Sequence, residues 1–165
     1  MSTKEKFKRR MFFILIVFWL AYYLLVSTTN LLALLKALTI LPKSWVFAST
    51  NYTQIVQVIA RYQLGHHAAL CLLGLATVAE GGIGILFVFA LFVFLRKKID
   101  SLWIGCAFFC GAILWCLFIM TDEIFIVYNI EPTHIRLLIL TLVSALFYVD
   151  FFKKTDEKTK SAVGL

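Results

Sequence analysis

Four long apolar stretches, separated by short polar breaks, constrain this chain more than any other feature. They run approximately over residues 11–35, 67–95, 102–128 and 135–152. A helix needs about 20 mainly apolar residues to cross a hydrocarbon core about 30 Å thick. The sequence therefore predicts four membrane-spanning helices and a small multi-pass membrane protein.

The composition leaves little room for structure outside the membrane. Of the 165 residues, 62% are hydrophobic, and the mean hydropathy is +0.92. A soluble domain of this size could not bury that much apolar surface. The first stretch is also longer than the apolar core of a secretory signal, which has about 7–15 residues, so we expect it to be retained as a helix.

The net charge of +7 is explained by topology. Most of the 16 basic residues fall in three groups, at residues 4–10, 96–98 and 153–160. The connections between these groups hold only Lys36, Lys43, Arg61 and Arg136. This alternation is the positive-inside pattern, which predicts that both termini are cytoplasmic. The expected partner of these charges is the lipid bilayer with its anionic headgroups, and nothing supports a nucleic-acid partner.

These observations predict an all-α fold, an antiparallel four-helix transmembrane bundle. A basic cytoplasmic arm, residues 1–10, precedes the membrane domain at residues 11–152, and a charged cytoplasmic tail follows at residues 153–165. The first outer loop is the longest connection. Because Ile55, Val58 and Ile59 recur in it at helical spacing among polar residues, we expect a short amphipathic helix there, lying at the interface or capping the bundle.

Glu80 is the most informative single residue, since it lies near the middle of the second apolar stretch. A charged side chain at this depth costs roughly 2.5–3.5 kcal/mol, so Glu80 should face protein or water rather than lipid. Ala76 and Gly84 are four residues away on the same helix face, and such small residues allow close helix approach. Glu80 therefore has two possible roles. It relays a proton or ion or contacts a ligand, or it fixes helix packing through a hydrogen bond to a neighbouring helix.

Two adjacent acids, Asp122 and Glu123, lie near the outer end of the third stretch. Consecutive helical residues point about 100° apart, so one should face the bundle and the other a different surface. Arg136 and His134 stand at the start of the fourth stretch, where Arg136 could pair with either acid. The group predicts either an ion-pair network joining the helix ends or a polar pocket open to the outer face.

The histidines raise a metal or haem hypothesis that their spacing does not favour. His67 lies about 20 Å along a helix from Glu80, too far for one shared metal. His67, His134 and Glu123 could still converge on a metal ion, and two outer histidines could hold a haem. Interfacial histidines are more often solvated or capping residues, so we predict no metal site and no cofactor.

The order of these polar residues resembles that of a bacterial family of small, four-helix integral membrane proteins with no assigned function. The shared features are Asn30 at the end of the first helix, His66-His67, the central Glu80, the segment 122–128 and His134-Ile135-Arg136. In that family the third helix ends in Gly-Glu-Trp-Phe, followed by Trp-Gln-Ser. Glu123 and Phe125 match the first motif, whereas Asp122 and Ile124 replace its Gly and Trp, and the second motif is absent. The resemblance implies a bacterial inner (plasma) membrane location and no particular activity.

Three functions remain open from the sequence. The first is a non-enzymatic membrane protein with an outward-facing polar pocket for a lipid or small molecule, or an accessory subunit of a membrane complex. The second is a proton-coupled transporter or channel using Glu80, acting as a homo-oligomer or within a larger assembly. The third is a redox subunit that binds haem or quinone. The residues predicted to bind a ligand or relay protons are Asn30, His67, Glu80, Asp122, Glu123, His134 and Arg136.

No residue is predicted to be catalytic. No serine, cysteine or lysine has an evident activating base beside it, so covalent catalysis has no support in the sequence. We therefore expect a binding or transport role rather than an enzyme.

Overall fold

The part of the chain that the structure describes consists of helices joined by turns and loops. The computed structural model describes residues 3–96 and 102–163, with side chains described through residue 150. Its helices are α1 (Thr3–Ala37), α2 (Asn51–Ala60), α3 (His66–Leu95), α4 (Leu102–Phe125) and α5 (Glu131–Val163). Helices α1, α3 and α4 and the segment Glu131–Asp150 of α5 are long and apolar enough to cross a membrane. The predicted all-α fold, with four long apolar helices, is confirmed, and the chain is a multi-pass membrane protein.

The helices extend beyond the apolar stretches at both ends of the chain. Helix α1 begins at Thr3 and so includes the basic arm, and it continues past Asn30 to Ala37. The helix thus ends two residues beyond the predicted span of residues 11–35, and Asn30 lies within its last turns rather than at its end. Helix α5 runs on to Val163 through the charged tail, a segment without Gly or Pro that contains four Lys, a favourable helix former. The basic residues Lys97 and Lys98, and the side chains of the tail lysines, lie outside the described residues.

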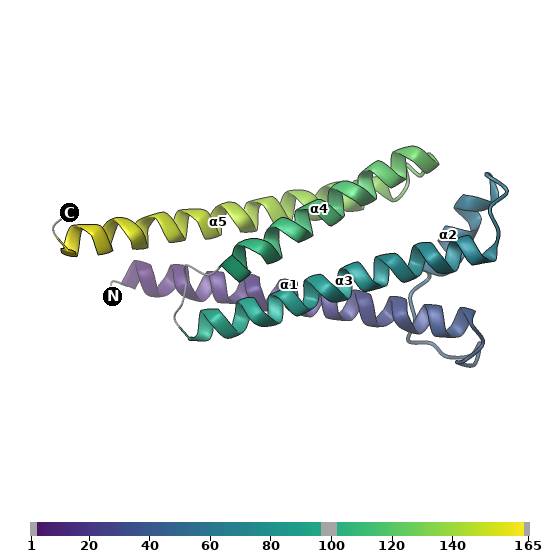
Figure 1. The fold of residues 1–165 in the computed structure, drawn as a ribbon, viewed down its shortest axis with the longest axis horizontal. Helices are drawn as coiled ribbons and strands as arrows, with labels where there is room; N and C mark the ends of the chain where they lie inside the picture. The colour runs from purple at the N-terminus through teal and green to yellow at the C-terminus, as the bar shows by residue number, and fades with distance from the viewer. Residues whose placement is uncertain (1–2, 97–101, 164–165) are drawn as a thin grey trace.

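The long helices form two diverging pairs. Helix α1 packs along α3, helix α4 packs along α5, and α3 also contacts α4 (Figure 1). Successive long helices alternate in direction, and the two pairs lie close at the end that carries both chain termini (Figure 1). They spread apart toward the opposite end, where α2 lies. We call these the termini end and the α2 end.

The termini half of the bundle is filled by a closely packed aromatic core. Phe12, Trp19, Tyr23, Phe87 and Trp115 are all at most 2% exposed. The ring of Tyr23 stacks against both Phe87 and Trp115, with centroids 5.8 Å apart in each pair. Aromatic pairs of this kind contribute roughly 0.5–1.5 kcal/mol beyond their burial. This core joins α1, α3 and α4 on the side of Glu80 nearer the termini.

Small residues let α1 and α3 approach closely beside Glu80. A Cβ atom added to Gly84 would lie 3.1 Å from Cδ2 of Leu24, and one added to Gly81 would lie 3.7 Å from Oγ of Ser27. A Cβ at Gly82 would meet nothing within 4 Å. The predicted interhelical seam is therefore present, formed by Gly81 and Gly84 but not by Gly82.

Helix α4 ends three residues earlier than the apolar stretch predicts. Ile126 adopts the left-handed conformation, with φ of 55°. Its N–H bonds to the carbonyl of Glu123 at 3.3 Å, and the N–H of Val127 bonds to the carbonyl of Asp122 at 2.9 Å. These two bonds form a Schellman motif, which stops the helix at Phe125 although the following residues are still apolar.

Candidate functional site

The central acid on α3 is bound by an amide on α1. Nδ2 of Asn30 donates a 2.8 Å hydrogen bond to Oε2 of Glu80. Both side chains are buried, with Asn30 1% and Glu80 3% exposed. The expectation that Glu80 faces protein rather than lipid is therefore met. The seam described above sets this geometry, because close approach of α1 and α3 brings the two side chains into range.

Asn30 also connects α1 to the start of α2. Its Oδ1 accepts hydrogen bonds from Oγ of Ser49 at 2.6 Å and from Nδ2 of Asn51 at 2.8 Å. The backbone N–H of Ser49 bonds to the carbonyl of Thr29 at 3.0 Å. Asn30 thus uses both ends of its amide, one toward Glu80 and one toward α2. Sequence reasoning missed Ser49 and Asn51, because Ser49 lies in a loop and Asn51 begins α2, and contacts at such positions carry no periodic signal.

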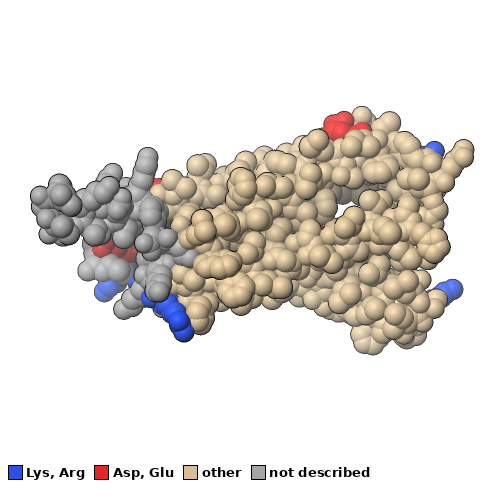
Figure 2. All heavy atoms as spheres, in the orientation of Figure 1, with Lys and Arg blue, Asp and Glu red and all other residues tan. Residues whose placement is uncertain are grey.

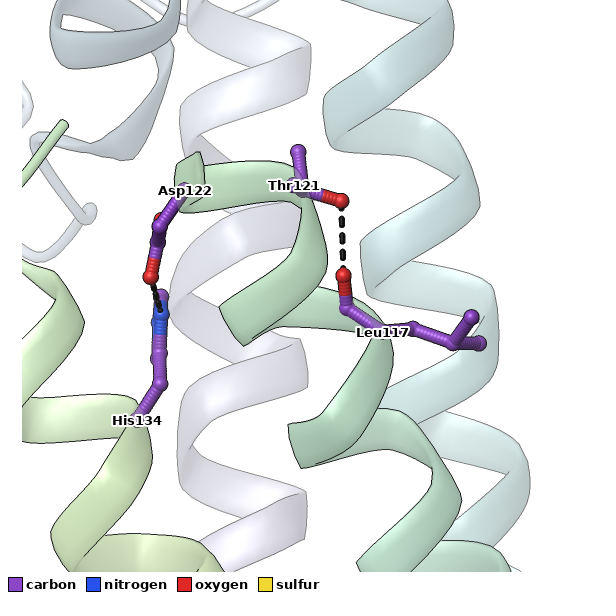
Figure 3. A network of polar contacts seen from close by, with 4 residues as sticks. All are labelled: Leu117, Thr121, Asp122 and His134. Carbon is purple, nitrogen blue, oxygen red and sulfur yellow. Dashed lines mark hydrogen bonds and ion pairs between the residues drawn. The ribbon is translucent and has the colours of Figure 1, made fainter. Parts of the chain in front are cut away.

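A second polar pair joins α4 to α5. Nδ1 of His134 lies 2.5 Å from Oδ2 of Asp122, and the two side chains point toward each other between the helices (Figure 3). The His134 ring also packs against Phe118 and Trp115, at centroid distances of 5.1 and 6.1 Å. The neighbouring Thr121 instead donates a 2.7 Å bond to the carbonyl of Leu117 within α4. His134 is therefore held by a polar contact to Asp122 and by packing against two aromatic rings.

Glu123 and Arg136, the two other charged residues predicted at this site, take no part in the contact between Asp122 and His134. Asp122 is 7% exposed, whereas Glu123 is exposed, so one acid faces the bundle and the other does not, as expected. Arg136 is exposed and forms no ion pair with either acid among the described residues. The predicted Arg136 pairing is wrong because residues two apart on a helix do not share a face, and His134 occupies the face toward α4.

Both polar pairs line one cavity near the α2 end. The cavity has a volume of about 720 Å³ and lies where the two helix pairs diverge; Figure 2 shows the molecule hollowed in this region. Asn30, Glu80, Asp122 and His134 all contribute to its wall. Helix α2 closes it at the α2 end through Asn51, Gln54, Ile55, Val58 and Ile59. The predicted amphipathic helix therefore exists and caps the cavity with its apolar face.

Most of the remaining wall is apolar. Aromatic rings come from Tyr22, Trp115, Phe118 and Phe125, and no Lys or Arg belongs to the lining. Two lining residues, Leu75 on α3 and Leu117 on α4, are 70% and 53% exposed on the outside of the bundle. The cavity therefore reaches the lateral surface between α3 and α4, the face that would contact lipid.

The outer histidines are not brought together. His67 is exposed at the start of α3 and does not line the cavity that His134 faces. Its ring contacts that of His66, which in turn contacts the hydroxyl of Tyr52. Across residues 3–96 and 102–150, no three His, Cys, Asp or Glu side chains are grouped so that they could hold a metal ion. The proposed convergence of His67, His134 and Glu123 is therefore wrong.

Comparison with known proteins finds no relative of this chain. No family model, no curated protein and no solved structure matches the chain.

Proposed function

We propose that this is a non-enzymatic membrane protein that binds a lipid or small molecule in the cavity between α3 and α4. One observation carries the proposal: a single cavity brings together Glu80 with Asn30 and Asp122 with His134. Four polar side chains converging in a mainly apolar wall are typical of small-molecule sites, and the volume of about 720 Å³ falls in their usual range.

The positive-inside pattern supports an orientation in which the cavity faces outward. The termini end carries the basic residues of α1 and Arg96, whereas few basic residues lie at the α2 end. We therefore propose that both termini are cytoplasmic and that α2 lies on the outer side. The resemblance to small bacterial four-helix proteins leads us to propose the bacterial inner membrane as the location.

A proton-coupled transporter using Glu80 is the second candidate, and the packing favours it less. Transport needs a path from the cavity to the termini end. Among the described residues, the interior on that side is occupied by the aromatic core of Phe12, Trp19, Tyr23 and Phe87. Two buried polar groups of this core differ: Nε1 of Trp19 donates a 3.1 Å bond to Ser144, whereas the hydroxyl of Tyr23 has no hydrogen-bond partner among the described residues. A channel through one chain would require this core to separate.

A haem or quinone redox subunit is the third candidate. This candidate requires two histidines on different helices, His67 and His134, to bind the same group. Of these two, only His134 faces the cavity, and its ring is already bound to Asp122. An accessory role in a larger complex is compatible with the same fold, but the cavity favours ligand binding as the primary activity.

Native mass spectrometry of the protein released from a mild detergent tests the proposal. The wild-type protein should retain a bound small molecule or lipid, which organic extraction then identifies. Ala76→Phe places a ring in the cavity and should abolish the adduct, whereas Val78→Phe adds the same ring to the same helix at a position 75% exposed and outside the cavity. Equal loss in both variants, or an adduct that persists in Ala76→Phe, would argue against the cavity.

A further inference from the structure

We infer that the ligand is a cationic amphiphile, a molecule with a protonated amine and an apolar chain, whose amine is held by Glu80. This inference rests on the proposed function and specifies the chemistry of the same cavity.

The carboxyl group of Glu80 has an incomplete set of hydrogen-bond partners. The carboxyl group is buried and has one side-chain partner among the described residues, the neutral amide of Asn30 on Oε2. Its Oε1 accepts no hydrogen bond from those residues, although the side chain forms part of the cavity wall. A buried carboxylate is normally paired with a cation, and none of the described residues supplies one here. A ligand ammonium would supply both the charge and the missing donor.

The charged residues of the cavity wall are mainly acidic. The lining contains two acids, Glu80 and Asp122, and no Lys or Arg. The one basic side chain in the wall, His134, is engaged by Asp122. An anionic headgroup would therefore meet a buried acid with no free cation to offset it, so phosphate and carboxylate ligands are disfavoured. A positively charged group is the complement of this wall.

The cavity is large and mainly apolar. These two properties exclude a bare metal or alkali ion as its main occupant. A volume of about 720 Å³ exceeds what one ion needs, and most of the wall is hydrocarbon. Tyr22, Trp115 and Phe118 add ring faces that attract an ammonium and pack against a chain. The cavity thus fits a headgroup near Glu80 and an apolar body beside it.

The cavity opens laterally between α3 and α4. Leu75 and Leu117 both line the cavity and are exposed on the outside of the bundle between α3 and α4. A ligand that partitions into the bilayer could enter there without crossing the α2 cap. Lateral access suits an amphiphile better than a freely soluble metabolite.

Three probes of equal chain length separate charge from hydrophobicity: dodecylamine, dodecanol and dodecanoate. Each is titrated at neutral pH against the full-length protein, and bound molecules are counted by native mass spectrometry. Dodecylamine should bind most tightly. Glu80→Gln keeps the shape of the side chain and should weaken dodecylamine about tenfold to a hundredfold while leaving dodecanol nearly unchanged. Glu123→Gln removes an exposed acid outside the cavity and is the matched control.

The outcomes separate this inference from the proposed function. If dodecanol or dodecanoate binds as tightly as dodecylamine, and Ala76→Phe abolishes that binding, the cavity binds ligands but the cationic assignment is wrong. If no probe distinguishes wild type from Ala76→Phe, and no adduct co-purifies, both the inference and the proposed function fail. Equal weakening of dodecylamine by Glu80→Gln and Glu123→Gln would show general surface attraction and overturn the role of Glu80. A circular dichroism spectrum and an elution volume matching the wild type show that each variant is folded.

Discussion

Nδ2 of Asn30 on α1 and Oε2 of Glu80 on α3 form a 2.8 Å hydrogen bond between two side chains that are almost fully buried. The same amide accepts two further bonds on Oδ1 from Ser49 and Asn51. One asparagine therefore links the intramembrane acid, the α1–α3 seam and the helix that caps the cavity. Its removal should affect all three.

Asn30→Ala should lower the free energy of unfolding by about 1–3 kcal/mol, because it leaves a buried carboxyl group without its donor. It should also loosen the start of α2, since Ser49 and Asn51 lose their acceptor. Thermal unfolding in detergent measures the first effect, and hydrogen exchange at residues 49–54 measures the second. Thr28→Ala, an exposed change on the same helix, should be nearly neutral. Unchanged exchange at the start of α2 would contradict the linking role of Asn30.

The membrane architecture and the burial of Glu80 could be predicted from the sequence because both follow from transfer energies. Long apolar stretches must cross the bilayer or aggregate, and an acid at mid-depth must avoid lipid. The short helix α2 could be predicted from the spacing of Ile55, Val58 and Ile59, since its apolar face needs cover. Each of these features is determined by the residues of a single segment of the chain.

The rest of the site depends on how segments meet, which the sequence does not encode locally. The choice of His134 over Arg136 as partner of Asp122 is set by the rotation of α5 about its axis. The contacts of Ser49 and Asn51 come from the end of a loop and the first residue of α2. The cavity itself exists because the two helix pairs diverge toward the α2 end (Figure 1). No pattern within one helix predicts that divergence.

His134→Ala should destabilise the protein by about 1–3 kcal/mol, because Asp122 would remain buried without its partner and two aromatic contacts of the ring would be lost. His67→Ala, at an exposed position outside the cavity, should change stability by less than about 0.5 kcal/mol. The two midpoints of thermal unfolding can be compared directly. Equal effects of the two substitutions would show that the Asp122 pair contributes no specific stability.

Gly111→Ala should disrupt the aromatic core, because the added Cβ would lie 2.8 Å from the hydroxyl oxygen of Tyr23. Tyr23 cannot easily move, since its ring is stacked between Phe87 and Trp115. We expect a loss of about 1–3 kcal/mol in thermal or denaturant unfolding.

Two variants control this result. Gly105→Ala, on the same helix with nothing within 4 Å of the added Cβ, should be neutral or slightly stabilising. Tyr23→Phe removes the clashing hydroxyl, which is buried without a regular hydrogen-bond partner among the described residues, and should restore tolerance of Gly111→Ala. If the double variant is no better than Gly111→Ala alone, the clash is not the cause.

Ile126→Gly should stabilise the protein by about 1 kcal/mol. Ile126 has φ of 55°, a conformation that costs a β-branched residue roughly 1–2 kcal/mol and costs glycine almost nothing. Ile126→Ala keeps a Cβ and should recover less of this energy. Denaturant midpoints of the three proteins test the expected order of stability, in which the glycine variant is the most stable, the alanine variant is intermediate and the wild type is the least stable. A glycine variant less stable than the wild type would mean that the contacts of the Ile126 side chain outweigh its backbone strain.

The most direct test of the account is to map where a photoreactive long-chain amine attaches to the folded protein. A diazirine on the alkyl chain is activated by light, and the labelled residues are identified by mass spectrometry of proteolytic peptides. We predict labelling at cavity residues such as Ala76, Leu114 and Phe118, with loss of that labelling in Glu80→Gln but not in Glu123→Gln. Labelling confined to the lipid-facing surface, for example at Val78 and Leu146, with the same pattern in Glu80→Gln, would contradict the account.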